Sequence, residues 1–374
     1  MKKIIALLLA LSLVLCGCGR APAQEATTEA TTEATTEATT EPTTEPTTEP
    51  PPVYTNPLNG ETSYEPFTNR IFATTMTNTR DALPHVSMNE ADIVMEMFVN
   101  GTIIRCLALF SDISKVEPFG PIRSTRLMFN DIAQHYNAVL LHAAGTSKVL
   151  NDLAARGVDN INMDSWRTEE SGASYRDKEY GRGYEHSLFG RGAGVVAYAQ
   201  TEDIQIPTTV EEGADYGLLF TEDGTPANGE RADLVTVRIK YNSSKKDSNM
   251  VYDAHLGKYV FYQYGEMMTD LITGEPEAFE NVVAMFAPIY MNGPYHYADF
   301  LPGGTGYYAC GGKIIPITWT CDGDDQPFRF FTEDGEPLAF GVGNTYIAIT
   351  SDKGSVTWEI REPEVEETSA ETEG

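Results

Sequence analysis

The stretch Gly120-Pro-Ile-Arg-Ser-Thr-Arg126 is followed by Leu127–Tyr136, where apolar residues recur at helical spacing, and then by the apolar run Ala138–Leu141. This order predicts a strand-to-helix corner, a helix over 127–136 and a buried strand over 138–141. A second helix is expected from about Lys148 to Arg156. Strands that alternate with helices are typical of an α/β unit with parallel strands, and this unit decides the fold of the first part of the chain.

Polar residues gather where these strands end and the helices begin. The free N–H groups and the dipole of a helix start attract anions, and open α/β sheets bind ligands at this edge. Arginine adds a planar fork that grips phosphate or carboxylate in two places. The alternative is structural: Ser124, Thr125 or Ser147 would cap a helix, and His142 would belong to the core. The sequence predicts an anion-binding pocket with these candidates: Arg105, Arg123, Ser124, Arg126, His142, Thr146, Ser147 and His186.

Two apolar runs, Asp92–Val99 and Thr102–Phe110, flank Asn100-Gly101. Asn and Gly tolerate the positive φ of a tight turn, so this pattern predicts a β-hairpin. A two-residue turn would place Val99 opposite Thr102 and Glu96 opposite Arg105. That pair is either an ordinary cross-strand ion pair or a contact that orients Arg105 toward a ligand.

The amino terminus has the features of a bacterial lipoprotein signal. Met1-Lys2-Lys3 is basic, and Ile4–Leu15 is apolar but too short to span a bilayer. Leu15-Cys-Gly-Cys-Gly19 fits a lipobox in which Cys18 is modified, because the small Gly17 precedes it. We predict a signal peptide over 1–18, with acyl chains such as palmitate anchoring Cys18 at the extracytoplasmic face of the bacterial cell membrane. Secretion with an ordinary signal peptide is the alternative.

A low-complexity segment follows, with repeats of Thr-Thr-Glu-Ala and Thr-Thr-Glu-Pro. It has no apolar face and its Glu residues repel one another, so we predict an extended tether over 19–53. The formal net charge of the chain is -29. Much of that charge lies in the tether and in the acidic carboxyl terminus. A chain this acidic lacks the basic surface that nucleic-acid binding needs, so no nucleic-acid partner is predicted.

About 300 residues remain to fold, which is more than one core usually supports, so two domains are expected. The predicted fold class is α+β or α/β, with an N-terminal α/β domain over 54–205 that contains the hairpin and the βαβα unit. An acidic linker over 206–230 and a mostly antiparallel, β-rich domain over 231–352 follow. In that domain Val235, Val237 and Ile239 alternate with polar residues, as in a strand with one buried face. The tail over 353–374 is predicted to be disordered.

The cysteines after the leader are expected to be free, buried thiols. Gly311-Gly312 predicts a hairpin turn after Cys310, which would carry Cys321 roughly 20 Å along the return strand. Cys106 lies in the earlier hairpin. No metal-ligand spacing is present, and neither a metal nor a cofactor is predicted.

The segment Met163–Arg191 is polar, glycine-rich and long for a loop, which is typical either of a functional loop or of a disordered one. It could bring His186 over the pocket. The pair His186-Ser187 invites a nucleophilic mechanism, but no Gly-x-Ser-x-Gly elbow surrounds any serine of the chain. The Tyr-rich strands of the second part could stack on sugars, or form a core or a domain interface.

Taken together, these motifs resemble the YerB-like lipoproteins, a two-part family of domains of unknown function. Two positions depart from the family pattern, since Ala144-Gly145 replaces Gly-Gly and His186-Ser187 replaces His-Asn. The resemblance implies an envelope lipoprotein with an α/β first part and a β-rich second part, and it implies no established activity. The similarity runs from Asn56-Pro-Leu-Asn-Gly60 to Ile349 and includes Glu90–Val94 with Glu96, the Arg105 strand, 120–126, 136–138, His142, Tyr252-Asp253, 270–274 and 343–347.

Three functions are compatible with this sequence. The first is a lipid-anchored, non-catalytic protein that binds an anionic cell-wall component or an envelope protein through its arginines. The second is an enzyme of phosphoryl or glycosyl transfer on cell-wall precursors, in which arginines offset phosphate charge and Glu96, Asp92 or His142 acts as acid or base. The third is an architectural protein whose β-rich part is the interaction surface.

Overall fold

The computed structural model describes residues 53–67, 70–178, 182–206 and 215–361. The expected signal peptide, Cys18 and nearly all of the expected tether therefore lie outside the described residues. Within these ranges no helix combines the length and the apolar composition that crossing a membrane requires.

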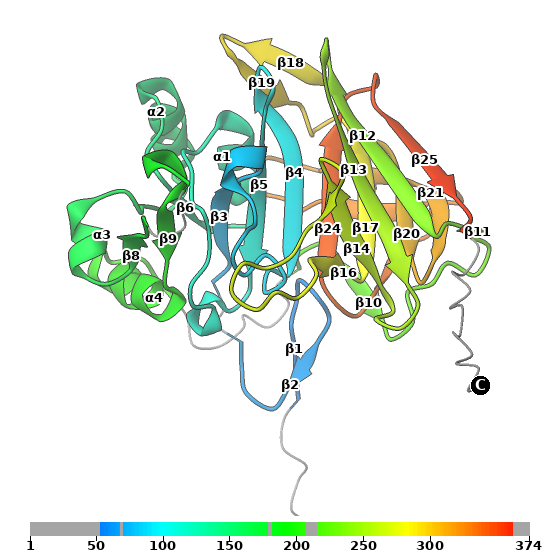
Figure 1. Cartoon of the computed structure of the whole chain (residues 1–374), viewed down its shortest axis with the longest axis horizontal. Helices are drawn as coiled ribbons and strands as arrows, with labels where there is room; N and C mark the ends of the chain where they lie inside the picture. Colours follow the sequence, from blue (N-terminus) through cyan, green and yellow to red (C-terminus); the bar gives the residue numbers. More distant parts are fainter. Residues whose placement is uncertain (1–52, 68–69, 179–181, 207–214, 362–374) are drawn as a thin grey trace, which may run out of the picture. The chain divides into compact units, whose positions relative to one another are not determined.

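An 11-stranded sheet contains strands from both halves of the chain (Figure 1). The first half contributes β3 (Phe72–Thr77), β4 (Ile93–Asn100), β5 (Ile103–Phe110), β6 (Val139–His142) and β7 (Asn160–Asn162). The second half contributes β11 (Glu230–Arg231), β17 (Asn281–Phe286), β20 (Gly304–Cys310), β21 (Lys313–Thr320), β22 (Arg329–Thr332) and β24 (Thr345–Thr350). The strand order is β11-β21-β20-β17-β24-β4-β5-β3-β6-β7, and β22 pairs with β21.

Strand β24 joins the two halves. It runs parallel to β17 on one side and to β4 on the other, with Ile347 opposite Met95. All six of its residues are buried, as expected for a strand covered on both faces. The two predicted domains therefore share one sheet, because strands predicted for the second domain continue the sheet of the first.

A second sheet of six strands is formed by the second half alone. It consists of β12 (Leu234–Tyr241), β13 (Ser244–Asp253), β14 (Lys258–Gln263), β15 (Glu266–Met267), β16 (Ala278–Phe279) and β25 (Ser355–Glu359). Alternate residues of β12 are buried, which confirms its predicted single buried face. Strand β25 pairs with β12, so the prediction of a disordered tail from residue 353 is wrong for its first residues.

The acidic linker is also partly structured. Within it β10 (Leu219–Thr221) pairs in parallel with β23 (Ala339–Gly341), and β11 pairs with β21. Paired strands satisfy their backbone groups, so these residues of the acidic linker belong to the folded structure. Residues 207–214 lie outside the described residues.

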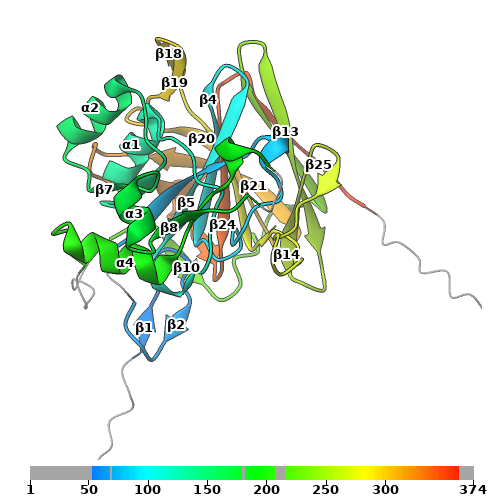
Figure 2. The same cartoon turned by 60° about the vertical axis from the view of Figure 1, so that its left-hand side comes forward.

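The helices are α1 (Leu127–His135), α2 (Ser147–Arg156), α3 (Trp166–Glu170) and α4 (Gly192–Thr201), which lie together beside the first-half strands (Figures 1 and 2). Apolar residues of the 11-stranded sheet form one core with the six-stranded sheet and α4, and another with α1 and α2. The remaining elements are β1 (Tyr54–Thr55), β2 (Thr62–Ser63), β8 (Ser174–Arg176), β9 (Leu188–Gly190), β18 (Ile289–Asn292), β19 (Tyr295–Ala298), and the 3-10 turns η1 (Arg80–Ala82), η2 (Ile113–Lys115) and η3 (Tyr184–His186).

The mixed α+β, β-rich fold is confirmed, and so are helices α1 and α2 and the strand β6 between them. Strand β6 runs parallel to β3 and to β7, which were not its predicted partners. The strand expected before α1 is absent. Residues 116–122 make only isolated bridges, because Pro118 and Pro121 have no N–H groups to give to a ladder. The expected helix caps are also absent, since Arg126 and Thr146 occupy the N-cap positions and neither side chain makes a capping bond.

The hairpin of β4 and β5 is confirmed, but its predicted register is wrong. Asn100 pairs with Ile103, and a β-bulge between Phe98 and Asn100 then shifts the pairing. Glu96 consequently lies opposite Cys106, while Arg105 lies opposite Met97. Since neighbouring positions of a strand face opposite sides, Glu96 and Arg105 are on different faces of the sheet.

The described cysteines agree with the sequence. Cys106, Cys310 and Cys321 are free and buried. The turn at Gly311-Gly312 joins β20 to β21, and Cys310 pairs with Lys313 across it. Cys321 follows the end of β21, far along the return strand from Cys310, which explains why the two thiols do not join.

Candidate functional site

The two polar segments predicted from the sequence lie side by side. The N–H of Arg123 donates to the carbonyl oxygen of Thr75 on β3 at 2.8 Å, and the N–H of Ala143 donates to the carbonyl oxygen of Arg123 at 3.0 Å. The N–H of Thr125 then donates to the carbonyl oxygen of Ala144 at 3.1 Å. The backbone ladder therefore fixes the segment before α1 against the segment that follows β6.

Three arginines meet at this place, and we call Arg105, Arg123 and Arg126 the arginine corner. Nη1 of Arg105 reaches from β5 to donate to the carbonyl oxygen of Ser124. Nη1 of Arg126 donates to the carbonyl oxygen of Thr125 at 2.7 Å, and its guanidinium lies 5.3 Å from the ring centroid of Tyr295 on β19.

Only one of these arginines has a carboxylate partner among the described residues. Nη2 of Arg123 lies 3.0 Å from Oε2 of Glu185, whose side chain is 73% exposed. Arg123 also donates to the backbone carbonyl of Glu185 at 2.6 Å. The buried Nε atoms of Arg105 and Arg126 have no hydrogen-bond partner within the described ranges.

Burial and mutual repulsion act on these charges together. Arg105 is 2% exposed, and its burial with the charges of Arg126 and Arg123 lowers its pKa to about 8. Burial, and the charge of Arg123 in addition, also lower the pKa of Arg126. Burial is the main cause of both shifts, and the neighbouring arginines add to it. A bound anion would act in the opposite direction, because it favours the charged form of each guanidinium.

The remaining predicted site residues differ in their availability. His142 is buried, with Nδ1 3.1 Å from the carbonyl oxygen of Ala144 and Nε2 3.1 Å from Oδ1 of Asn160, so both ring nitrogens are engaged. Burial lowers its pKa. Thr146 and Ser147 are exposed at the start of α2. His142 is therefore a satisfied core residue and not a group turned toward a ligand.

His186 lies on η3, next to Glu185. Its pKa is lowered first by burial and then by the nearby charge of Arg123, and its buried Nδ1 has no partner among the described residues. The long segment expected to approach the pocket does so through η3, because Glu185 contacts Arg123. Ser187 donates to the carbonyl oxygen of Tyr184 at 3.0 Å, and no bond to His186 prepares it as a nucleophile.

The two predicted carboxylates lie elsewhere. Glu96 is fully buried on the opposite face of β4, where its partners include Asn78 Nδ2, Lys246 Nζ and Tyr346 OH. Lys246 is on β13, so this network connects the two sheets. It stabilises the fold and has no access to a ligand.

Asp92 precedes β4 and anchors the first described loop. It accepts hydrogen bonds from Asn56 Nδ2 at 2.9 Å, from Asn59 Nδ2 at 2.7 Å and from the N–H of Ser111 at 2.6 Å. Burial raises its pKa to about 6. Five positions separate it from Met97, the partner of Arg105, which is roughly 17 Å along a strand. Asp92 is therefore not at the arginine corner.

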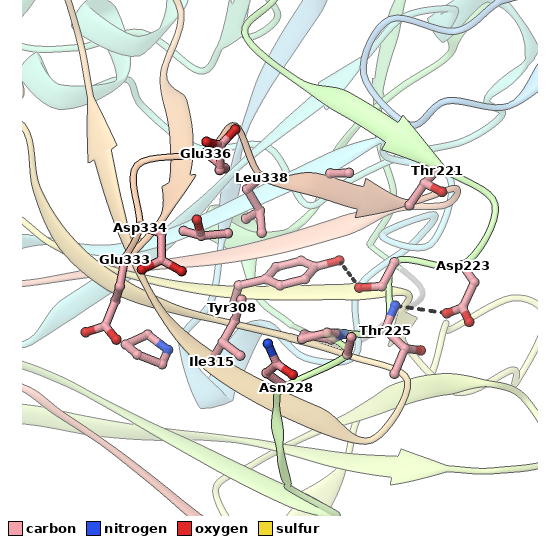
Figure 3. A pocket seen from close by; sticks show the side chains of 16 residues that line it. Thr221, Asp223, Thr225, Asn228, Tyr308, Ile315, Glu333, Asp334, Glu336 and Leu338 are labelled. Atoms are coloured by element: carbon pink, nitrogen blue, oxygen red, sulfur yellow. Dashed lines mark hydrogen bonds between the residues drawn. The ribbon is translucent and has the colours of Figure 1, made fainter.

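The second half of the chain carries a different hollow, of about 510 Å³ (Figure 3). The Tyr308 hydroxyl donates to the carbonyl oxygen of Gly224 at 3.2 Å at its edge. Its lining contains no Lys or Arg, so it does not suit an anion. The carboxylates that line it are Asp223, Glu333, Asp334 and Glu336. Across the described ranges no group of three or more His, Cys, Asp or Glu residues is placed to hold a metal ion.

Sequence reasoning missed two contributors to the corner. Tyr295 reaches it from the β18–β19 hairpin, and Glu185 reaches it from η3. Tyr295 lies 169 positions after Arg126 in the sequence, and no local pattern signals such a contact. Glu185 stands in the stretch expected to approach the pocket, and its acidic charge next to His186 was the available signal.

Comparisons with known proteins give one family. The chain matches "Protein of unknown function (DUF3048) N-terminal domain" over residues 58–205 and the C-terminal domain of the same family over residues 237–347. It is 27% identical over 309 residues to "Putative lipoprotein YerB" of Bacillus subtilis (strain 168), covering 79% of this chain and 86% of that protein. The crystal structure of YerB from Bacillus subtilis has a similar fold, with a TM-score of 0.68 and 22% identity over 81% of this chain and 99% of that one.

Proposed function

The chain belongs to the DUF3048 family, and on that premise we propose that it is a lipid-anchored protein of the bacterial envelope that binds an anionic ligand at the arginine corner. The name of the Bacillus subtilis relative and the lipobox ending at Cys18 support the anchor. The ligand is an anionic component of the cell envelope or an acidic segment of a partner protein.

One observation carries this proposal. Three guanidinium groups lie together, and among the described residues only one carboxylate, that of Glu185, pairs with any of them. Burying a positive charge without a counter-ion costs several kcal/mol. Arg105 is buried and bonded only to a backbone carbonyl among the described residues, so the fold retains a charge that weakens it. A ligand with negative oxygens would offset that cost, and phosphate or carboxylate matches the planar fork of arginine.

The exposed carboxylate of Glu185 occupies Arg123 in this arrangement. An exposed ion pair of this kind contributes little to stability, so an incoming anion can displace it at small cost. Glu185 therefore acts as an internal competitor for the ligand. Removing its charge should strengthen binding, which separates a ligand site from a purely structural cluster.

The transfer-enzyme alternative requires an acid or base at the reacting group. Glu96 lies on the other face of the sheet, Asp92 lies far along β4, and both ring nitrogens of His142 are engaged. His186, predicted as a ligand-binding residue, lies near Arg123, and among the described residues no carboxylate bonds to its ring to orient it as an acid or base. These placements favour binding over transfer.

The test is calorimetric titration of the full-length chain in detergent with inorganic phosphate. Each charge-assisted bond contributes about 1.5–3 kcal/mol, so Arg123→Ala/Arg126→Ala should weaken binding at least tenfold. Glu185→Gln should bind more tightly than wild type. The control Arg231→Ala/Arg238→Ala removes two exposed arginines from the second half and should change nothing. If the corner variant binds phosphate as well as wild type does, the corner is structural and the proposal fails.

A further inference from the structure

A second hollow, of about 380 Å³, is lined in part by η3, the turn that also carries Glu185, and we call it the aromatic hollow. Its walls come from α3, β8 and η3, which are three short elements of the long segment after β7. The side chains that matter here are Asp164, Trp166, Glu169, Arg176, Lys178 and Tyr184. None of its lining residues belongs to the hollow of about 510 Å³ in the second half of the chain.

Two large aromatic side chains of this hollow are unusually exposed. Trp166 is 70% exposed and Tyr184 is 64% exposed. Exposed indole and phenol rings lose the favourable free energy of burial that such rings normally gain in a folded protein. Exposed Trp and Tyr side chains are enriched at binding surfaces. Both rings therefore offer free surface on which a ligand can stack.

Tyr184 is held in place rather than loosely exposed. The guanidinium of Arg176 lies 3.7 Å from the ring centroid and covers one face of the ring. Nη1 of Arg176 donates to the carbonyl oxygen of Tyr184 at 2.7 Å, and Nη2 pairs with Oδ1 of Asp164 at 2.6 Å. Arg176 thus ties β8, η3 and Asp164 together, so the ring is fixed before a ligand arrives and less ordering entropy is lost on binding.

The rest of the lining is polar. Asp164 and Glu169 offer carboxylate oxygens, which accept from hydroxyl groups, and Lys178 offers an ammonium donor. A wholly apolar ligand would displace water from Glu169 and Lys178 without offering them hydrogen bonds, which costs free energy. A sugar ring satisfies both conditions, because its C–H faces stack on aromatic rings while its hydroxyls bond to carboxylates and amines around its edge.

The aromatic hollow and the arginine corner are joined through η3. Tyr184 lines the hollow, and the next residue, Glu185, contacts Arg123. The carbonyl oxygens of these neighbouring residues accept from Arg176 at 2.7 Å and from Arg123 at 2.6 Å, so an arginine of the hollow and an arginine of the corner meet the same short turn. A sugar in the hollow would therefore have Arg123 close by for an anionic group attached to it. We propose that the ligand of the arginine corner is an anionic saccharide, with a sugar ring stacked on Trp166 and Tyr184 and its phosphate or carboxylate group at Arg123 and Arg126. This inference rests on the proposed function and adds the chemical class of the ligand.

The experiment compares three probes on the full-length chain in detergent: N-acetylglucosamine 1-phosphate, inorganic phosphate and N-acetylglucosamine. Calorimetry gives the affinities, and tryptophan fluorescence reports stacking. The sugar phosphate should bind at least tenfold more tightly than phosphate and should change the emission. Trp166→Ala should abolish both the tenfold advantage and the emission change while phosphate binding persists. Trp358→Phe is the matched control and should behave as wild type.

The outcomes separate this inference from the proposed function. Equal affinity for phosphate and sugar phosphate in the wild type, or an advantage that survives in Trp166→Ala and Tyr184→Ala, overturns the saccharide inference and leaves the anion site standing. Binding of N-acetylglucosamine as tight as that of its phosphate, with no binding of phosphate, overturns the anion site and with it the anionic class of ligand. No binding of any probe overturns both.

Discussion

Replacing Arg105 by methionine should make the protein more stable and weaken its binding of anions. Arg105 is 2% exposed, and the residues described around it include no carboxylate partner. Methionine has a similar length, is flexible and carries no charge, so it can fill the same space between β5 and the segment before α1. Replacing a buried, uncompensated charge by an apolar side chain is generally neutral or stabilising.

The size of the effect follows from the electrostatics. The pKa of Arg105 is lowered from 12.5 to about 8, and at about 1.4 kcal/mol for each tenfold change this shift corresponds to roughly 6 kcal/mol of cost to the charged form. The substitution removes the bond to the carbonyl oxygen of Ser124, which costs about 1–3 kcal/mol. That oxygen keeps Nη1 of Arg126 as a donor at 3.4 Å. The difference is a net gain of about 3–5 kcal/mol, close to the upper end of the range for such replacements.

Urea unfolding of the full-length chain measures this change. Arg105→Met should raise the midpoint of unfolding without changing the slope, which would show that stability and not the compactness of either state has changed. The exposed Arg238, which pairs with Asp247 on the neighbouring strand, provides the control Arg238→Met, and its midpoint should stay where it is. In calorimetry Arg105→Met should bind phosphate about tenfold more weakly, the effect of losing one charge-assisted contact. A variant less stable than wild type would refute the reasoning, because Arg105 would then be a compensated structural residue.

Three further predictions concern the scaffold of the site. Gly120→Ala should lower the free energy of unfolding by about 2 kcal/mol in urea titrations, because φ is +146° and the new Cβ would lie 2.8 Å from Cδ1 of Phe189; no loss of stability would contradict it. Lys246→Met should cost about 3–5 kcal/mol by leaving Glu96 buried without its cation, and Glu96→Gln/Lys246→Met should recover most of that loss; a double variant as unstable as the single one would argue against the pairing. Burial lowers the pKa of His135 to about 4 from 6.5, so the unfolded chain takes up its proton first as the pH falls from 6.5. The wild type should therefore lose about 3 kcal/mol more stability than His135→Phe between pH 7 and pH 4, and parallel pH profiles would refute this assignment.

Local patterns predicted the elements of the fold well. The helical spacing over 127–136 and the alternation over Val235–Ile239 are properties of single segments, and both elements formed as expected. The register of the β4–β5 hairpin was missed because a single bulged residue changes the face of every later side chain. The joining of the two halves through β24 was missed because a parallel pairing between distant strands leaves no local signal.

In the candidate site, too, local features could be predicted from the sequence and long-range contacts could not. The gathering of arginines at Gly120–Arg126 could be expected from the sequence, since the residues are adjacent and stand before a helix. The position of Glu96 away from the site could not be expected, because its partner Lys246 belongs to the sheet that the other half of the chain forms. Ala144 adopts φ +58°, a conformation that favours glycine, and no pattern within the segment 138–147 signals it.

The most direct test of the central claim is a crystal structure of the chain grown in the presence of inorganic phosphate. The anion should lie within hydrogen-bond distance of the guanidinium groups of Arg123 and Arg126, with the side chain of Glu185 displaced from Arg123. Glu185 still bonded to Arg123 and no phosphate at the corner, at a concentration where phosphate occupies other sites, would contradict the account.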